Sequence, residues 1–140
     1  MAVTGRPGGG RAGRVLHVPA GECSGDTAQT GGMRRVAGIS GPLTGSRGIW
    51  MGLTRVEPHA LSGAHHHGPS ETAIYVVSGT PVFIYREGDE EVRLQTGPGD
   101  FVYVPPFVPH IESNAESAEE AVVVIARTTQ EAIVENLPAL

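Results

Sequence analysis

The sequence contains no lysine, so its ten basic residues are all arginines. A chain without lysine cannot form a Schiff base with a carbonyl substrate and has no lysine general base. The net charge is −5, and Arg6, Arg11 and Arg14 lie near the start with no acidic residue close by. The rest of the chain is therefore acidic and makes a poor surface for nucleic acid, so we expect no nucleic-acid partner.

Disulfides and long apolar segments are also missing. The single cysteine, Cys23, excludes an intramolecular disulfide framework. No apolar run reaches about 18 residues, the length needed for a transmembrane helix, and the N-terminus lacks an apolar signal core. These absences predict a cytoplasmic protein with no membrane partner.

The domain organisation follows from length and composition. Residues 1–14 are rich in glycine and arginine and hold too little apolar surface to order themselves, so we predict a disordered leader there. The remaining residues, 15–140, are enough for one domain with its own core.

Short apolar segments alternate with turn residues along most of the chain, which is typical of an all-β barrel or sandwich. No helix of real length is indicated before residue 129, and residues 129–140 form either a helical turn or an extended tail. The predicted strands cover residues 15–18, 33–40, 48–58, 71–79, 80–87, 92–96, 101–105 and 121–127.

A histidine triplet carries the strongest chemical signal. Alternate side chains of a strand share a face, so His65 and His67 point the same way and His66 points away. With Glu71 shortly after and His110 from a distant segment, three imidazoles and one carboxylate could close on one ion. This donor set suits Fe, Mn, Co, Ni, Cu or Zn, whereas calcium and magnesium prefer oxygen ligands alone.

The spacing His-x-His-x3-Glu, a later Pro-Gly-Asp, and Pro-x4-His-x3-Asn together resemble both signature motifs of the cupin superfamily. The resemblance covers about residues 40–127. It implies a jelly-roll β-barrel (a double-stranded β-helix) with one divalent transition metal per chain, held by His65, His67, Glu71 and His110. It also implies a homodimer, since small cupins commonly form one.

The sequence departs from the motifs at two places. Seven residues separate Glu71 from Gly79 where the family usually has six, so counting back from the glycine would put Thr72 in the ligand position. Because threonine is a poor ligand, we predict a β-bulge between Thr72 and Ile74 that keeps Glu71 on the metal and Tyr75 pointing outward.

The second departure is Phe107, which stands where a glycine is common. Phenylalanine resists positive φ, so we predict a turn in which Phe107 keeps a negative φ. We expect its ring to cover one mouth of the barrel.

Several polar side chains near the motifs have two readings each. Arg35, Arg55 and Arg127 are either solvated charges or, if one points inward, a bidentate clamp for a carboxylate substrate. Glu112 either orients a metal-bound imidazole or is a rim charge. Asn114 is expected to make a structural hydrogen bond at a strand end.

Aromatic residues in the predicted strands are candidates to line a cavity, and about half of them must face outward. They are Trp50, Tyr75, Phe83, Tyr85, Phe101 and Tyr103.

Three functions remain open from the sequence. We favour a metal-dependent enzyme, with Glu71 as a catalytic residue, that acts on a small organic acid or aromatic substrate as an oxygenase. A non-redox isomerase, lyase or cyclase, in which the ion is a Lewis acid, is the first alternative. A cupin that binds a small ligand without turnover is the second, because a fold alone does not determine function.

Overall fold

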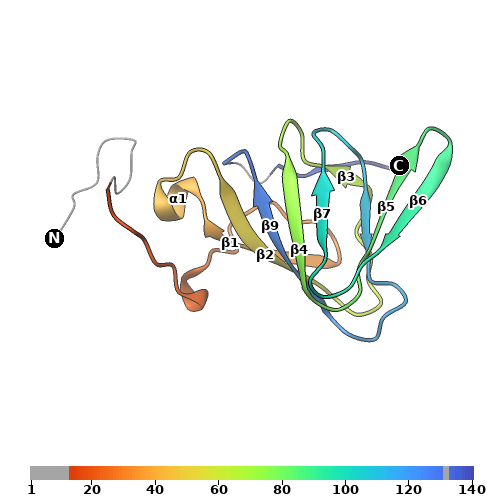
Figure 1. Cartoon of the computed structure of the whole chain (residues 1–140), viewed down its shortest axis with the longest axis horizontal. Helices are drawn as coiled ribbons and strands as arrows, with labels where there is room; N and C mark the ends of the chain where they lie inside the picture. Colours follow the sequence, from red (N-terminus) through yellow and green to blue (C-terminus); the bar gives the residue numbers. More distant parts are fainter. Residues whose placement is uncertain (1–12, 131–132) are drawn as a thin grey trace.

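The computed structural model describes residues 13–130 and 133–140, and these residues form an almost entirely β structure. The larger sheet has five strands in the order β1-β2-β9-β4-β7 (Figure 1). Its strands are β1 (Met33–Ile39), β2 (Trp50–Val56), β4 (Thr72–Ser78), β7 (Phe101–Val104) and β9 (Ala121–Arg127). Two short helical turns, η1 (Ala20–Glu22) and α1 (Gly41–Thr44), flank β1.

A second, three-stranded sheet has the order β6-β5-β8, and its β5–β6 hairpin lies at one end of the five-stranded sheet in Figure 1. Its strands are β5 (Val82–Glu87), β6 (Glu90–Gln95) and β8 (Ile111–Ser113). A two-stranded pair, β3 (His65–His66) with β10 (Glu135–Asn136), completes the architecture. The all-β jelly-roll prediction is confirmed.

The core lies between the two sheets, because Phe83 of β5 packs with buried residues of the larger sheet. Burial alternates strictly along β4 and β9, as it does when one face of a strand is buried. We call the buried side of the five-stranded sheet its inner face and the other side its outer face. The apolar residues of the inner face in this cluster are Ala37, Trp50, Ile74, Val76, Val104, Val123 and Ile125.

The two chain ends differ from the sequence prediction in part. The predicted strand at residues 15–18 is wrong: this segment pairs with no strand among the described residues, and Val15 is 99% exposed. Instead Leu16 and Val18 line a surface pocket together with Met51. The predicted leader lies outside the described residues apart from 13 and 14. The C-terminal tail is extended where β10 pairs with β3.

The bulge in β4 lies later than predicted. Pairing with β9 is regular from Thr72 to Val76, and the register shifts between Val76 and Ser78. The predicted bulge between Thr72 and Ile74 is therefore wrong. Regular pleating puts Thr72 on the inner face, whereas Glu71 and Tyr75 are exposed.

The turn before β8 also differs from the prediction. Phe107 has φ 61°, the left-handed conformation that its ring was expected to exclude. Its backbone N–H donates to the carbonyl of Gly68 at 2.8 Å, which holds the turn in this shape. Such a conformation costs a bulky residue about 1–3 kcal/mol. No helix in the described ranges is long and apolar enough to cross a membrane.

Candidate metal centre

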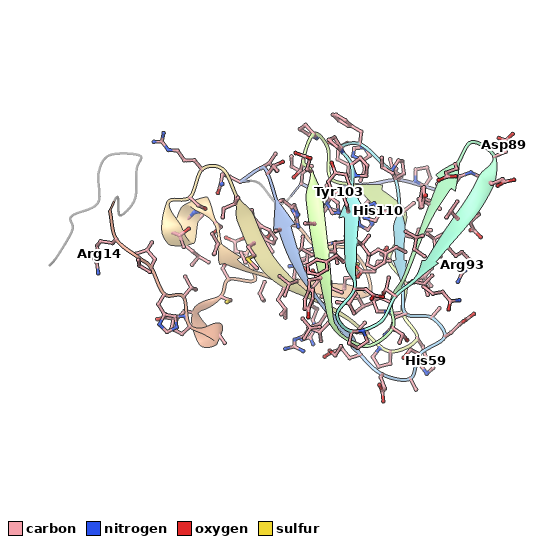
Figure 2. All side chains as sticks on the ribbon, viewed as in Figure 1. Arg14, His59, Asp89, Arg93, Tyr103 and His110 are labelled. Atoms are coloured by element: carbon pink, nitrogen blue, oxygen red, sulfur yellow. The ribbon has the colours of Figure 1, made fainter. Side chains whose placement is uncertain are left out.

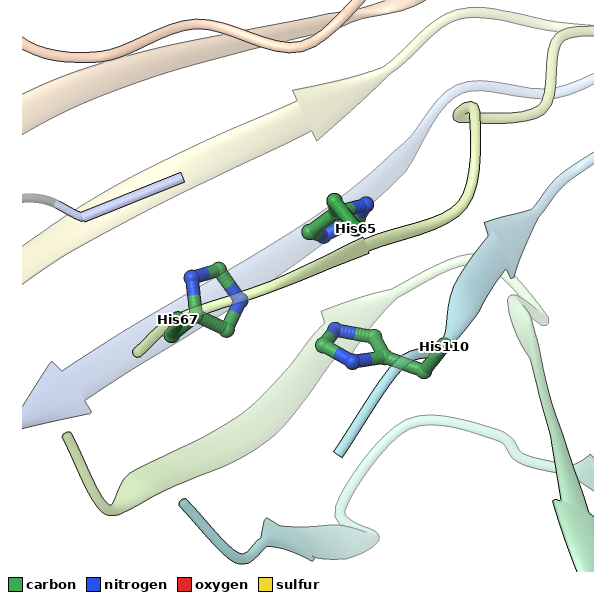
Figure 3. Close-up of side chains that lie close together, drawn as sticks. All are labelled: His65, His67 and His110. Carbon is green, nitrogen blue, oxygen red and sulfur yellow. The ribbon is translucent and has the colours of Figure 1, made fainter. Parts of the chain in front are cut away.

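Three histidines from two distant segments of the chain meet inside the structure (Figure 3). His65 belongs to β3, and His110, just before β8, forms a β-bridge with it through backbone bonds of 3.0 and 2.9 Å. His67 follows β3 with its side chain on the same side as His65. One ring nitrogen of each histidine lies within 4.8 Å of the others, and all three residues are buried.

Backbone carbonyls select the tautomer of each ring. The Nδ1 atoms of His65, His67 and His110 lie 2.9, 2.8 and 3.0 Å from the carbonyl oxygens of Gly63, Ile133 and Val108, respectively. A carbonyl oxygen only accepts, so each Nδ1 carries the proton and donates it. Each Nε2 therefore keeps its lone pair for a metal, and the carbonyl bond fixes the orientation of the ring.

Burial also keeps the rings neutral. It lowers the pKa of His65 to about 3 and that of His67 to about 2, with contributions from the neighbouring positive charges. Burial likewise lowers the pKa of His110. Neutral imidazole is the form that binds metal, so the three rings fit a divalent transition metal at neutral pH.

The structure does not bring Glu71 to these histidines. Its carboxylate is on the outer face and accepts a hydrogen bond from the Tyr103 hydroxyl at 2.7 Å. The physical reason is the position of the bulge, which leaves Thr72 as the residue that faces inward. The Thr72 hydroxyl is buried and has no hydrogen-bond partner in the described structure. The motif position implied for a carboxylate ligand thus holds a threonine.

His66 points away from the centre, as its strand parity predicted. It lies outside the cluster, and its Nδ1 accepts a hydrogen bond from the backbone N–H of Gly68 at 2.9 Å.

The three strand arginines fall into two groups. Arg55 is exposed and binds Glu120 at 2.9 Å, as a solvated charge would. Arg35 and Arg127 are each only 1% exposed and lie on the inner face. Arg35 donates to the Thr30 hydroxyl at 2.9 Å. The Arg127 guanidinium lies 4.3 Å from the Trp50 ring centroid.

Glu112 fits neither of its predicted roles. It is buried, which excludes a rim charge, and the Nδ1 atoms that it was expected to orient are bound to backbone carbonyls. Burial raises its pKa to about 7, an effect that the charge of Arg35 opposes. Asn114 does make the expected strand-end bonds, donating to the carbonyls of Glu57 at 3.1 Å and Glu119 at 2.7 Å.

A pocket of about 350 Å³ borders the centre at His110, which is one of its lining residues. Its walls are mainly apolar side chains of β5, β6 and β7, and Figure 2 labels His110 and Tyr103 among its residues. The aromatic candidates divide about as expected: Trp50 and Phe83 are buried, Tyr85 is half-buried, and Tyr75, Phe101 and Tyr103 are exposed.

The jelly-roll fold and the buried three-histidine centre define the class of protein, and comparison with known families identifies the family. The family model described as "Cupin domain" matches residues 52–126, more than half of the chain, and the chain belongs to this family. The family resemblance read from the two motifs is thereby confirmed.

The similar solved structures share the fold. One is oxalate decarboxylase from Bacillus subtilis at pH 4.6, with a TM-score of 0.68, 20% identity, and coverage of 80% of this chain and 29% of that chain. Another structure of that decarboxylase, whose title names Mn(II) centres, has a TM-score of 0.68 and 21% identity over 79% of this chain and 29% of that chain. An oxalate oxidase in complex with the substrate analogue glycolate has a TM-score of 0.72 and 18% identity over 91% of this chain and 66% of that chain.

The chain thus spans less than a third of the length of the decarboxylase, and the low identity makes this a likeness of fold. No curated protein sequence matches the chain.

Proposed function

We propose that this chain is a metal-dependent cupin enzyme acting on a small organic acid, with the ion held by His65, His67 and His110. The observation that carries the proposal is that the three imidazole rings lie together, with each Nδ1 bound to a backbone carbonyl and each Nε2 therefore left with its lone pair. A structural zinc site would be closed by a fourth protein ligand. The described residues supply three, which leaves positions for a substrate.

The chain's own residues would perform three tasks. The histidines hold the ion, their carbonyl partners keep the rings in position, and burial excludes bulk water from the centre. The apolar pocket beside His110 admits the carbon skeleton of the substrate, which keeps aromatic acids within the substrate class. When bound, the ion would supply Lewis acidity and, if redox-active, oxygen chemistry.

We favour an oxygenase, as the sequence suggested, and the fold neighbours support oxidative or decarboxylating chemistry on a small acid. One of these neighbours is named oxalate oxidase and another oxalate decarboxylase. The non-redox isomerase, lyase or cyclase uses the same residues with the ion as a Lewis acid only.

Metal replacement tests the proposal. The metal-free protein is reconstituted in turn with Fe, Mn, Co, Ni, Cu and Zn and screened with small carboxylic and aromatic acids in an oxygen electrode. Oxygen uptake with a redox-active ion, lost in His67→Ala and kept in His66→Ala, is the expected result. Turnover with zinc and no oxygen uptake would establish the Lewis-acid alternative. Acid binding without any turnover would establish the ligand-binding alternative.

We further propose that the protein is a homodimer located in the cytoplasm. The outer face of β4 and β7 exposes Tyr75, Val77 and Phe101, with exposed fractions of 38%, 46% and 79%. Exposed apolar patches of this kind mark interfaces. Light scattering is expected to give twice the mass of one chain, and a concentration-independent monomer mass would contradict the dimer.

A further inference from the structure

Arg127 is the least satisfied charged group in the described structure. It is the last residue of β9, lies on the inner face and is only 1% exposed. Its Nε, Nη1 and Nη2 atoms have no hydrogen-bond partner among the described residues. A guanidinium has five N–H donors, and burying it without acceptors is costly, so a partner from outside the chain is the natural way to satisfy it.

A structural arginine would look different, and Arg35 shows how. Arg35 donates to the Thr30 hydroxyl at 2.9 Å and to the Ala28 carbonyl at 3.4 Å. It also has a negative neighbour, because the charge of Glu112 raises its pKa against the larger lowering by burial. For Arg127, burial lowers the pKa to about 9, and the charge that adds to this lowering is that of Arg35. Among the described residues, Arg127 thus has neither hydrogen-bond acceptors nor a counter-charge.

The charge of Arg127 also acts on the three-histidine centre. After burial, its charge is the largest effect that lowers the pKa of His67, and it also lowers that of His65. In Figure 3, β9 passes behind these two histidines. The cross-strand neighbours of Arg127 are Trp50 and Thr72.

Those two neighbours complete a binding surface. The Trp50 ring lies against the guanidinium at 4.3 Å and can fix its plane while leaving its N–H edge free. The Thr72 hydroxyl, also buried and without a partner, supplies another donor. A planar N–H fork beside a hydroxyl matches the two oxygens of a carboxylate.

We propose that Arg127, Trp50 and Thr72 form a carboxylate subsite, and that the preferred ligand is a small organic dianion whose second oxygen group reaches the three-histidine centre. The inference rests on the proposed function for that second contact. A divalent ion held by neutral imidazoles alone keeps its full charge, since Glu71 faces outward. Together with Arg127 this favours a dianion over a monoanion or a neutral molecule.

Oxalate is the probe, and isothermal titration calorimetry measures its binding to metal-free and zinc-loaded protein. Acetate and neutral oxamide are titrated in parallel. The variants are Arg127→Met, which keeps the volume without the charge, and Arg127→Lys, which keeps the charge without the fork. Arg55→Met is the matched control from the outer face of the same sheet. Circular dichroism establishes folding, and elemental analysis gives the zinc content of each sample.

We expect oxalate to bind both the metal-free and the zinc-loaded parent protein, and to bind the zinc-loaded form more tightly. Acetate should bind at least tenfold more weakly than oxalate, and oxamide should not bind. Arg127→Met should weaken oxalate binding at least 100-fold and Arg127→Lys at least tenfold, with zinc content unchanged and Arg55→Met within twofold of the parent. If Arg127→Met does not fold, the Arg127→Lys result decides.

Oxalate affinity within twofold of the parent in the folded Arg127 variants would overturn the subsite. A parent protein that binds no zinc would instead contradict the proposed function. In that case the Arg127 dependence in the metal-free titration still decides the subsite.

Discussion

The two faces of the five-stranded sheet differ at one charge, that of Arg127. On the outer face, Arg55 and Arg34 approach Glu120 at 2.9 and 3.8 Å, and Glu71 accepts a hydrogen bond from Tyr103. On the inner face, Arg127 is buried without an acceptor in the described structure. These three solvated groups, Arg34, Arg55 and Glu71, have partners, whereas the buried charge of Arg127 has none among the described residues.

The unpaired charge on the inner face indicates a ligand-binding role for that face. Exposed ion pairs contribute at most about 1 kcal/mol, so the outer pairs say little about stability. An unpaired buried charge costs several kcal/mol, so its retention points to a ligand that completes the site. We therefore expect the three histidines and Arg127 to bind a metal and an anion in the interior, and we expect neither on the outer face.

The largest expected effect is the loss of metal when an inward histidine is removed. His67→Ala and His110→Ala should each lower the affinity for zinc by more than about 100-fold, the upper range for loss of a merely supporting residue. His66→Ala is the matched control, because this neighbour points away and should keep the parent's affinity. Elemental analysis after dialysis measures it, and unchanged metal in both inward variants would refute the three-histidine centre.

The second effect is acid sensitivity of the metal-free protein. Folded-state pKa values of about 3 for His65 and about 2 for His67, with that of His110 also lowered, lie below the ordinary 6.5. Below pH 6.5 the unfolded chain therefore binds protons that the folded protein does not, and the free energy of unfolding falls as pH drops toward 3. Glu112, with a pKa raised to about 7, opposes this by taking up one proton when folded.

For the groups His65, His67 and Glu112, the net difference near pH 5.5 is about one proton, or about 1.4 kcal/mol per pH unit, and the lowered pKa of His110 adds in the same direction. Thermal melts between pH 7 and 5 measure it, and His67→Gln should reduce the slope by about one proton. A melting temperature that stays constant or rises on acidification would contradict the buried neutral histidines.

Arginine substitutions on the two faces should change stability in opposite directions. In buffer free of carboxylate and phosphate, Arg127→Met should raise the free energy of unfolding by about 1–3 kcal/mol, because it removes an uncompensated buried charge. Arg55→Met should lower it by at most about 1 kcal/mol. Urea unfolding gives both values. A clear loss of stability in Arg127→Met alone would mean that the guanidinium is structural.

Carboxylate changes at the neighbouring positions 71 and 72 should affect zinc affinity only on the inner face. Thr72→Glu places an anionic ligand on the inner face and should raise zinc affinity about tenfold while weakening oxalate binding, because the added charge competes with the anion. Glu71→Gln, on the outer face, should leave zinc affinity unchanged. Competition with a chelator measures both affinities. Loss of zinc in Glu71→Gln would restore Glu71 as the ligand that the motif implied.

Residue spacing was enough to predict the fold and the three histidines that meet in the interior. Period-two alternation separated His65 and His67 from His66, and the second motif identified His110. The same residue counting showed that one extra residue follows Glu71, but it did not show where along the strand the β-bulge lies. The bulge lies next to Gly79, which has φ 82° and whose added Cβ would come within 2.7 Å of the Ala121 backbone. Its position thus depends on a tertiary contact with β9, and so does the face on which Glu71 lies.

The arginines were beyond sequence reasoning for a related reason. Arg127 ends a strand, residues 121–127, whose other side chains are all apolar, so alternation of apolar and polar residues could not give its direction. Its lack of acceptors emerges only once Trp50 and Thr72 are placed beside it by pairing of β9 with β2 and β4.

The most direct test is a crystal structure of the zinc-loaded protein with anomalous data collected at the zinc edge. The three-histidine centre predicts one zinc peak per chain at about 2.0–2.1 Å from the Nε2 atoms of His65, His67 and His110, with no oxygen of Glu71 on the ion. A peak bound by Glu71, or no peak among the three histidines, would contradict it.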